Sequence, residues 1–215
     1  MRFINFFQRD FSSAIYNFSC NFIENYILKI KDTKWQHFKW KGIALLKDPM
    51  SITIYMQMLQ DIKPKTILEF GTYEGGTALW ISDVMKSINE KCIIHTFDIN
   101  SEQVKLPDTD NIVFHQLDVF KIKDFINDNQ SLFNSLEHPI LVIEDCHENV
   151  LEVLESVDVF LKKEDYLIVE DTIDYNKHQV LSTYLQNKDY VVDCYYCDFW
   201  GYNNSWNFNS ILRKR

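Results

Sequence analysis

Two pairs of adjacent acids are the residues of this chain best suited to chemistry. Glu144 and Asp145 directly follow one apolar run, and Glu170 and Asp171 directly follow another. If both runs are neighbouring parallel strands, their carboxyl ends crowd these carboxylates, which cannot all stay ionised without compensation. A divalent cation would supply that compensation, and oxygen ligands point to Mg²⁺, Ca²⁺ or Mn²⁺ rather than zinc. The alternative is two pairs of solvated turn acids, which their shared position at strand ends disfavours.

A glycine-rich segment is the second candidate site. Three of the five glycines of the chain fall in Glu69-Phe-Gly71-Thr-Tyr-Glu-Gly75-Gly76, directly after an apolar run. The pattern predicts a strand, a tight turn and a helix start, which together point backbone N–H groups at a ligand. The spacing differs from the Gly-x-Gly-x-x-Gly fingerprint of dinucleotide binders, and Glu69 suits an ammonium group better than a pyrophosphate.

Asp98 ends the strand predicted next along the chain. A carboxylate at that place can accept hydrogen bonds from ribose hydroxyls. The alternative is an aspartate that only caps a turn.

The elements that must position these residues alternate between strand and helix. This order predicts one α/β domain with a mainly parallel sheet. The expected strands are 65–70, 92–97, 112–115, 140–143, 166–169, 190–196 and 208–212, and the clearest expected helices are 77–85 and 150–161.

Composition narrows the class of partner. The net charge is -9 and the sequence pI is about 5.1, and no dense block of Lys and Arg could track phosphates, so a nucleic-acid partner is not expected. No apolar run is long enough for a membrane span. Five cysteines at irregular positions do not form a disulfide framework. We therefore expect a cytoplasmic protein with a small-molecule partner.

These motifs together resemble those of class I S-adenosylmethionine-dependent methyltransferases. The chain looks most like the cephalosporin hydroxylase and rhamnosyl O-methyltransferase family, whose metal-dependent members mostly methylate sugar or related hydroxyls. The resemblance covers roughly residues 38 to 215 and includes Asp118, Ile143-Glu-Asp-Cys-His147 and Ile168-Val-Glu-Asp171. It implies a Rossmann-like sheet of seven strands, mainly parallel with the last strand antiparallel, in a domain spanning 38–215.

The resemblance also implies roles for individual residues. Glu69 and the backbone at Gly71 and Gly75 would hold the methionine part of the cofactor, Asp98 the ribose and Asp118 the adenine amino group. Tyr73, inside the glycine turn, is the aromatic residue we favour as a cofactor contact. The implied ligands of Mg²⁺ or Mn²⁺ are Asp145, Glu170 and Asp171.

The implied reaction is methyl transfer to a hydroxyl of a sugar or a nucleotide-linked sugar. A cation would help remove the proton of the hydroxyl, and the base would be Asp145 itself or His147. A structural or helix-capping role for His147 is the alternative. Three other functions stay open: an NAD-type oxidoreductase, an iron oxygenase and a non-catalytic scaffold of methyltransferase-like fold.

The remaining features carry weaker predictions. Cys194-x-x-Cys197 is expected to lie in a strand without a redox or zinc role, and His178 is expected at the surface of a helix. Residues 1–37 form a separate N-terminal helical extension in this interpretation, because aromatic residues recur at near-helical intervals from Phe3 to Ile30. Such a helix would pack on its own domain, cover the active site or mediate a homo-oligomer contact; a membrane-surface helix is the least favoured option.

Overall fold

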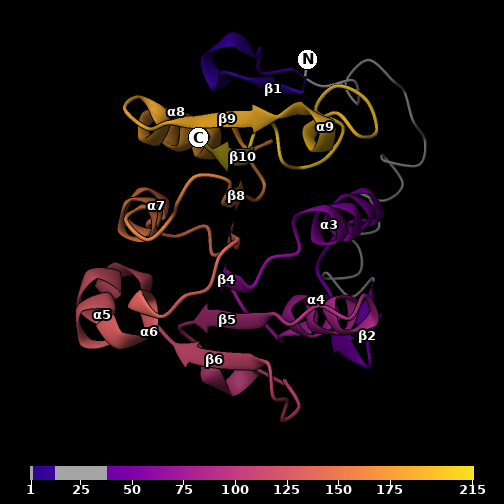
Figure 1. Ribbon diagram of the computed structural model, residues 1–215, viewed down its shortest axis with the longest axis vertical. Helices are drawn as coiled ribbons and strands as arrows, with labels where there is room; N and C mark the ends of the chain where they lie inside the picture. The colour runs from indigo at the N-terminus through magenta and orange to yellow at the C-terminus, as the bar shows by residue number, and fades with distance from the viewer. Residues whose placement is uncertain (1, 13–37) are drawn as a thin grey trace.

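The computed structural model describes residues 2–12 and 38–215, and a single large sheet organises them. Its strands are β1 Phe3–Ile4, β4 Thr66–Phe70, β5 Ile93–Asp98, β6 Ile112–Gln116, β7 Ile140–Glu144, β8 Tyr166–Val169, β9 Tyr190–Asp193 and β10 Ile211–Lys214. The order across the sheet is β1-β9-β10-β8-β7-β4-β5-β6 (Figure 1). Neighbours from β6 to β8 are parallel, whereas β10 runs antiparallel to both β8 and β9. The predicted Rossmann-like α/β fold with an antiparallel last strand is confirmed.

Helices cover both faces of the sheet. They are α3 Pro49–Ile62, α4 Gly76–Ser87, α5 Ile122–Asp128, α6 Gln130–Asn134, α7 Val150–Asp158, α8 Tyr175–Leu185 and α9 Cys194–Cys197. Short 3-10 helices span Phe6–Gln8, Ser101–Gln103 and Val119–Lys121, and β2 Lys39–Trp40 pairs with β3 Ile43–Ala44 in a small separate hairpin. Helix α3 packs on α4, and α7 packs on both α5 and α8. Figure 1 shows these two groups on opposite sides of the sheet.

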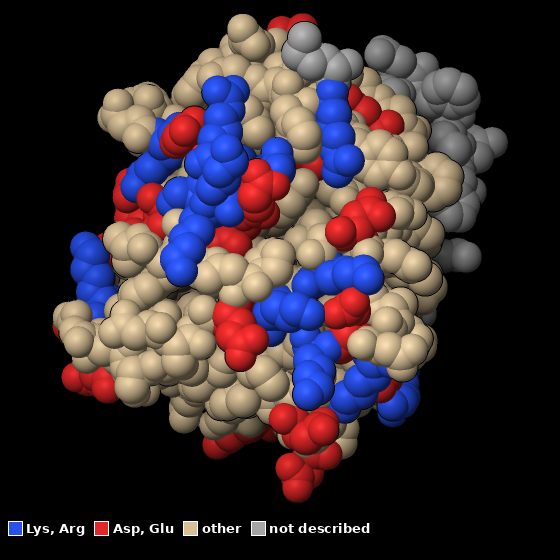
Figure 2. Space-filling view, in the orientation of Figure 1, with Lys and Arg blue, Asp and Glu red and all other residues tan. Residues whose placement is uncertain are grey.

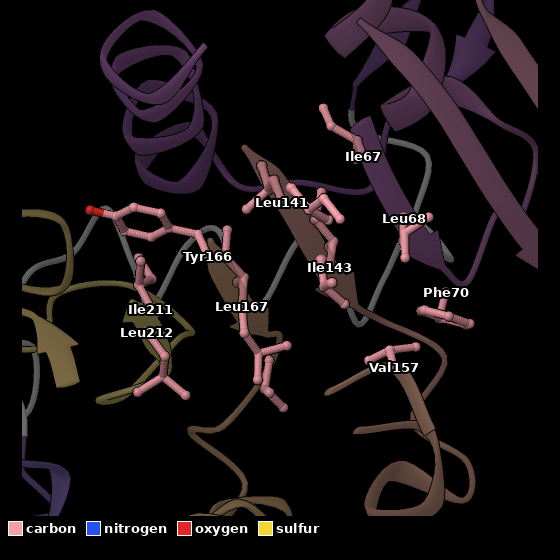
Figure 3. Packing of buried hydrophobic residues seen from close by; sticks show 14 of the residues in the cluster. Ile67, Leu68, Phe70, Leu141, Ile143, Val157, Tyr166, Leu167, Ile211 and Leu212 are labelled. Atoms are coloured by element: carbon pink, nitrogen blue, oxygen red, sulfur yellow. The ribbon is translucent and has the colours of Figure 1, made fainter. Parts of the chain in front are cut away.

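The core lies along the central strands. Every residue of β4, β7 and β8 is buried, because parallel strands in the middle of a sheet are covered on both faces. Figure 3 shows Ile67, Leu141, Leu167 and Ile211 on successive strands of this core. Continuous apolar runs, rather than alternating ones, mark these strands in the sequence for the same reason.

The N-terminus departs from the prediction of a helix beginning at Phe3. Phe3–Ile4 forms the edge strand β1, which pairs antiparallel with β9, so the sheet has eight strands instead of seven. Residues 13–37, where most of the predicted aromatic helix falls, lie outside the described residues.

Two local predictions were also wrong. Cys194–Cys197 is a one-turn helix, not a strand, because the Asp193 side chain accepts the Tyr195 backbone N–H and caps a turn there. His178 is only 6% exposed, because Phe6 of the N-terminal segment stacks on it and Phe11 meets it edge-on. Among the described residues, no helix is both long and apolar enough to cross a bilayer.

Candidate active site

The five neighbouring parallel strands all end at one edge of the sheet, where the site forms. The turns after β4 and β7 lie against each other there. Gly71 has a φ of +108°, and a Cβ atom on it would lie 2.6 Å from the backbone oxygen of Asp145. The backbone N–H of Asp145 donates to the Phe70 carbonyl at 2.8 Å. Glycine is therefore required at residue 71 both for its backbone conformation and for space.

A cavity of about 350 Å³ opens above these turns. Of the predicted site residues, it is lined by Gly71, Tyr73, Asp98, Asp118, Asp145 and His147. Volumes of this order are typical of small-molecule sites. The structure thus brings together residues from the ends of β4, β5, β6 and β7 around one hollow.

Gly75 and Glu69 do not line that cavity. Gly75 precedes α4 with a φ of +94°, and a Cβ atom there would lie 2.4 Å from Cγ of Leu106. Glu69 lies beneath the turn and is 1% exposed, and the Thr96 hydroxyl donates to its Oε2 at 2.6 Å. Burial raises the pKa of Glu69 to about 7.

Asp98 and Asp118 are both held by backbone groups at the cavity. The Asp98 carboxylate accepts the N–H of Tyr73 at 2.8 Å and that of Asn100 at 3.0 Å. Asp118 caps the short 3-10 helix by accepting the N–H of Phe120 at 3.1 Å. These bonds leave lone pairs on both carboxylates for a ligand.

A cluster of ligating groups lies at the ends of β7 and β8. Asp145, His147 and Asp171 each place one ligand atom within 4.8 Å of the others. His147 Nε2 lies 3.5 Å from Asp145 Oδ1 and 3.4 Å from Asp171 Oδ2. His147 and Asp171 both have positive φ angles, of 61° and 56°, an uncommon conformation for residues with side chains.

Glu170 is buried beside this cluster and has protein partners of its own. The Tyr55 hydroxyl donates to its Oε1, and Lys47 Nζ lies 3.2 Å from the same oxygen and 2.6 Å from Asp145 Oδ2. Burial by itself would lower the pKa of Lys47, but Asp145 and Glu170 raise it well above its usual value. Burial raises the pKa of Glu170 to about 7 against the opposing effect of Lys47. Burial, followed by the charge of Asp145, also raises the pKa of Asp171.

Lys47 and Tyr55 were not predicted as site residues. Lys47 precedes α3 and Tyr55 lies in its middle, and both are far along the chain from the acids. Lys47 precedes a strong helix-start signal, since Asp48 caps α3 and Pro49 is its first residue. That signal locates the helix but says nothing about which strand ends it faces.

A second unpredicted lysine supports His147. Lys177, in the first turn of α8, places Nζ 2.8 Å from Glu144 Oε2 and 2.8 Å from His147 Nδ1. The other oxygen of Glu144 accepts the backbone N–H groups of Cys146 and His147 at 3.2 and 3.1 Å. Glu144 is fully buried, and its contacts hold the loop that carries Asp145 and His147.

Comparison of the chain with known proteins identifies its family. A family model described as "Rhamnosyl O-methyltransferase/CmcI" matches residues 32–189. The chain belongs to the rhamnosyl O-methyltransferase/CmcI family. It is 27% identical over 176 residues to a rhamnosyl O-methyltransferase of Mycobacterium leprae (strain TN), covering 78% of this chain and 74% of that protein.

The fold of this chain resembles that of CmcI in solved structures. The apo form of CmcI has a TM-score of 0.70 and 27% identity, covering 83% of this chain and 76% of CmcI. A form with Mg and S-adenosylmethionine has a TM-score of 0.69 and 29% identity, covering 85% and 78%.

The residues present fit the divalent cation that the family implies. The cluster offers hard carboxylate oxygens, which Mg²⁺ and Mn²⁺ prefer. Asp171 is 43% exposed at its side chain and Asp145 is 23% exposed, so both oxygens can be reached from solvent.

Proposed function

We propose that this protein is a metal-dependent O-methyltransferase that moves a methyl group from S-adenosylmethionine to a sugar hydroxyl. One observation carries the proposal: Asp145 and His147 line the cavity above the glycine turn and also belong to the cluster with Asp171. A cofactor in that cavity and a cation on that cluster would therefore be neighbours. Family membership favours this reaction over the oxidoreductase and oxygenase alternatives.

The cofactor side of the site would use the residues around the cavity. Asp98 would accept hydrogen bonds from the ribose, Asp118 would receive the adenine amino group, and Tyr73 would pack against the ligand. The backbone at Gly71 would hold the methionine part, and Glu69 and Gly75 would shape the turn from below and from the helix side.

We propose Asp145, Glu170 and Asp171 as the cation ligands. When bound, the cofactor supplies the methyl group and the cation lowers the cost of removing a proton from the acceptor hydroxyl. Lys47 and Tyr55 hold Glu170 and Asp145 in place before binding. Such preorganisation lowers the cost of assembling a cation site.

Asp145 is the better candidate for the base. Lys177 Nζ can only donate, so His147 Nδ1 accepts from it and the ring proton lies on Nε2, which faces Asp145 and Asp171. In this tautomer His147 cannot take up a second proton at Nε2. We therefore assign the proton transfer to Asp145 and the orientation of both carboxylates to His147.

The acceptor we propose is a sugar or a nucleotide-linked sugar. The support is that the curated relatives are named rhamnosyl O-methyltransferases. Figure 2 shows acidic side chains lying among the basic ones on the face displayed, which does not favour a nucleic-acid partner. The four described cysteines are free, which supports our expectation of a reducing cytoplasmic compartment.

Calorimetry and a methyl-transfer assay test this function together. S-adenosylmethionine should bind in the presence of EDTA, whereas transfer to a panel of glycosides and nucleotide sugars should require Mg²⁺ or Mn²⁺. Asp145→Ala should retain cofactor binding and lose transfer by at least about a hundredfold, the typical worth of a positioned base. Asp110→Ala, at an exposed acid, is the matched control. Full activity in excess EDTA would refute the metal assignment.

A further inference from the structure

The N-terminal arm, residues 2–12, lies outside the family match, which begins at residue 32. The arm adds β1 to the edge of the sheet beside β9, at the top of the molecule in Figure 1. Arg2, at its start, forms a bidentate ion pair with the buried Asp193 of β9. The first half of the arm is thus fixed to the sheet, and its second half reaches a different part of the fold.

Arg9 fastens that second half to the C-terminal loop, residues 198–210, which connects α9 to β10. Its side chain is only 3% exposed. One guanidinium nitrogen donates to Asp198 Oδ1 at 2.7 Å, and Nε donates to Asn209 Oδ1 at 2.5 Å. A third contact reaches Asn203 Oδ1 at 3.2 Å. The planar guanidinium spreads its donors over separate nitrogens, and the single nitrogen of lysine could not reach these acceptors together.

Two amides of the loop hold the backbone of the arm in return. Asn203 Nδ2 donates to the Ser12 carbonyl at 2.9 Å, and Asn209 Nδ2 donates to the Asp10 carbonyl at 3.2 Å. The arm and the loop therefore form one hydrogen-bonded unit, centred on a buried charge.

The same loop supports the turn that carries Asp171. Asn207 Oδ1 accepts the backbone N–H of Asp171 at 3.1 Å, and the Trp206 carbonyl accepts that of Ile173 at 3.0 Å. The hydroxyl of Thr172 donates to the Phe208 carbonyl at 3.0 Å. These bonds hold Asp171 in its left-handed conformation, which a non-glycine residue adopts only when its surroundings enforce it.

We propose that Arg9 is a positioning residue for Asp171, acting through the C-terminal loop and Asn207. This inference rests on the proposed function, in which Asp171 is a ligand of the catalytic cation. The arm orders the loop, the loop orders the turn after β8, and the turn aims the Asp171 carboxylate at Asp145 and His147.

The test measures Mn²⁺ binding to the full chain by the loss of the free-ion electron paramagnetic resonance signal. Arg9→Met should weaken Mn²⁺ binding about tenfold, the lower end of the usual loss for groups that support a ligand. Affinity for S-adenosylmethionine, measured by calorimetry in EDTA, should not change. Arg2→Met, which loosens the arm at β9 without touching the loop, is the matched control and should keep Mn²⁺ affinity. Equal losses of Mn²⁺ affinity in both variants would mean that any detachment of the arm disturbs the site, and would overturn the inference.

A double-mutant cycle tests the route. Asn207→Ala should weaken Mn²⁺ binding as Arg9→Met does. The double variant should bind Mn²⁺ as tightly as the single variant of lower affinity, because both changes break one chain of contacts. Additive losses would overturn the route through Asn207. If Arg9→Met does not fold, unchanged Mn²⁺ affinity in Asn207→Ala still overturns the inference.

The variant Asp171→Asn distinguishes failure of this inference from failure of the proposed function. Loss of Mn²⁺ binding in Asp171→Asn with none in Arg9→Met refutes only the role of Arg9. Unchanged Mn²⁺ binding in Asp171→Asn refutes Asp171 as a cation ligand, and the inference about Arg9 falls with it.

Discussion

At the scale of single residues, burial sets the chemistry of Glu69. Its carboxylate lies beneath the glycine turn, where the Thr96 hydroxyl is its hydrogen-bond partner and Asp145 and Asp98 add negative charge. Loss of water around the charged form is the main reason for the raised pKa. The folded chain therefore holds a proton on Glu69 at a pH where the unfolded chain has released it.

This difference predicts how stability depends on pH. Between about pH 4.5 and pH 7 the folded state binds more protons at Glu69 than the unfolded state, so stability should fall as pH rises through that window. Glu69→Gln cannot ionise, and its advantage over the wild type should grow from nothing at pH 4.5 to at most about 3 kcal/mol above pH 7. Urea unfolding at several pH values measures it. Parallel curves for the two proteins would contradict the prediction, and Glu152→Gln at the surface of α7 is the control.

At the scale of elements, α8 determines how the loop after β7 is held. Its first turn places Lys177 between Glu144 and His147, because the Asp174 side chain caps the helix there by accepting the N–H groups of Asn176 and Lys177. Lys177 and Glu144 thus form a buried ion pair between a helix and a strand end. Such pairs cost free energy to desolvate, and removing one partner leaves the other charge uncompensated.

The ion pair yields a prediction about stability. Lys177→Met should lower the free energy of unfolding by about 3 kcal/mol, since Glu144 is left buried without its counter-charge. The double variant Lys177→Met with Glu144→Gln should recover most of that loss, because the amide oxygen can still accept the backbone N–H groups of Cys146 and His147. Chemical denaturation measures both. A double variant as unstable as Lys177→Met would show that the pair is not the cause.

At the scale of the whole molecule, the proposed cation would link the ends of the neighbouring strands β7 and β8. The acids come from β7 and β8, and Lys47 comes from the segment before α3. A ligand that binds only the folded chain stabilises it in proportion to the logarithm of its concentration relative to its dissociation constant. Cation binding should therefore be visible as a change in global stability.

Thermal unfolding with and without Mg²⁺ measures that change. Mg²⁺ at a hundred times its dissociation constant should add about 2.7 kcal/mol to the free energy of unfolding and raise the melting temperature, and EDTA should reverse the effect. Asp171→Asn should remove most of the response, while Asp110→Ala should keep it. An equal rise in the wild type and in Asp171→Asn would show that Mg²⁺ acts elsewhere.

The sequence by itself determined the α/β fold and the edge of the sheet where the site forms. Apolar runs marked the strands, and parallel strands end together, so Asp98, Asp145 and Asp171 could be assigned to one edge before any contact was known. The glycine turn could be located for a similar local reason, because Gly71 and Gly75 both have positive φ angles that glycine adopts without strain.

Only the tertiary structure decided what surrounds those acids. Lys47 and Tyr55 reach the site from a segment far from the acids in the chain, and Arg9 acts on it through the C-terminal loop. Lys177 is nearer in sequence, but no local pattern distinguishes any of these residues from solvated or core side chains. The edge strand β1 was missed because two residues carry no periodicity, and His178 is buried only because the arm covers it. Local spacing encodes which strand an acid follows, whereas the partner of a buried charge depends on contacts across the whole fold.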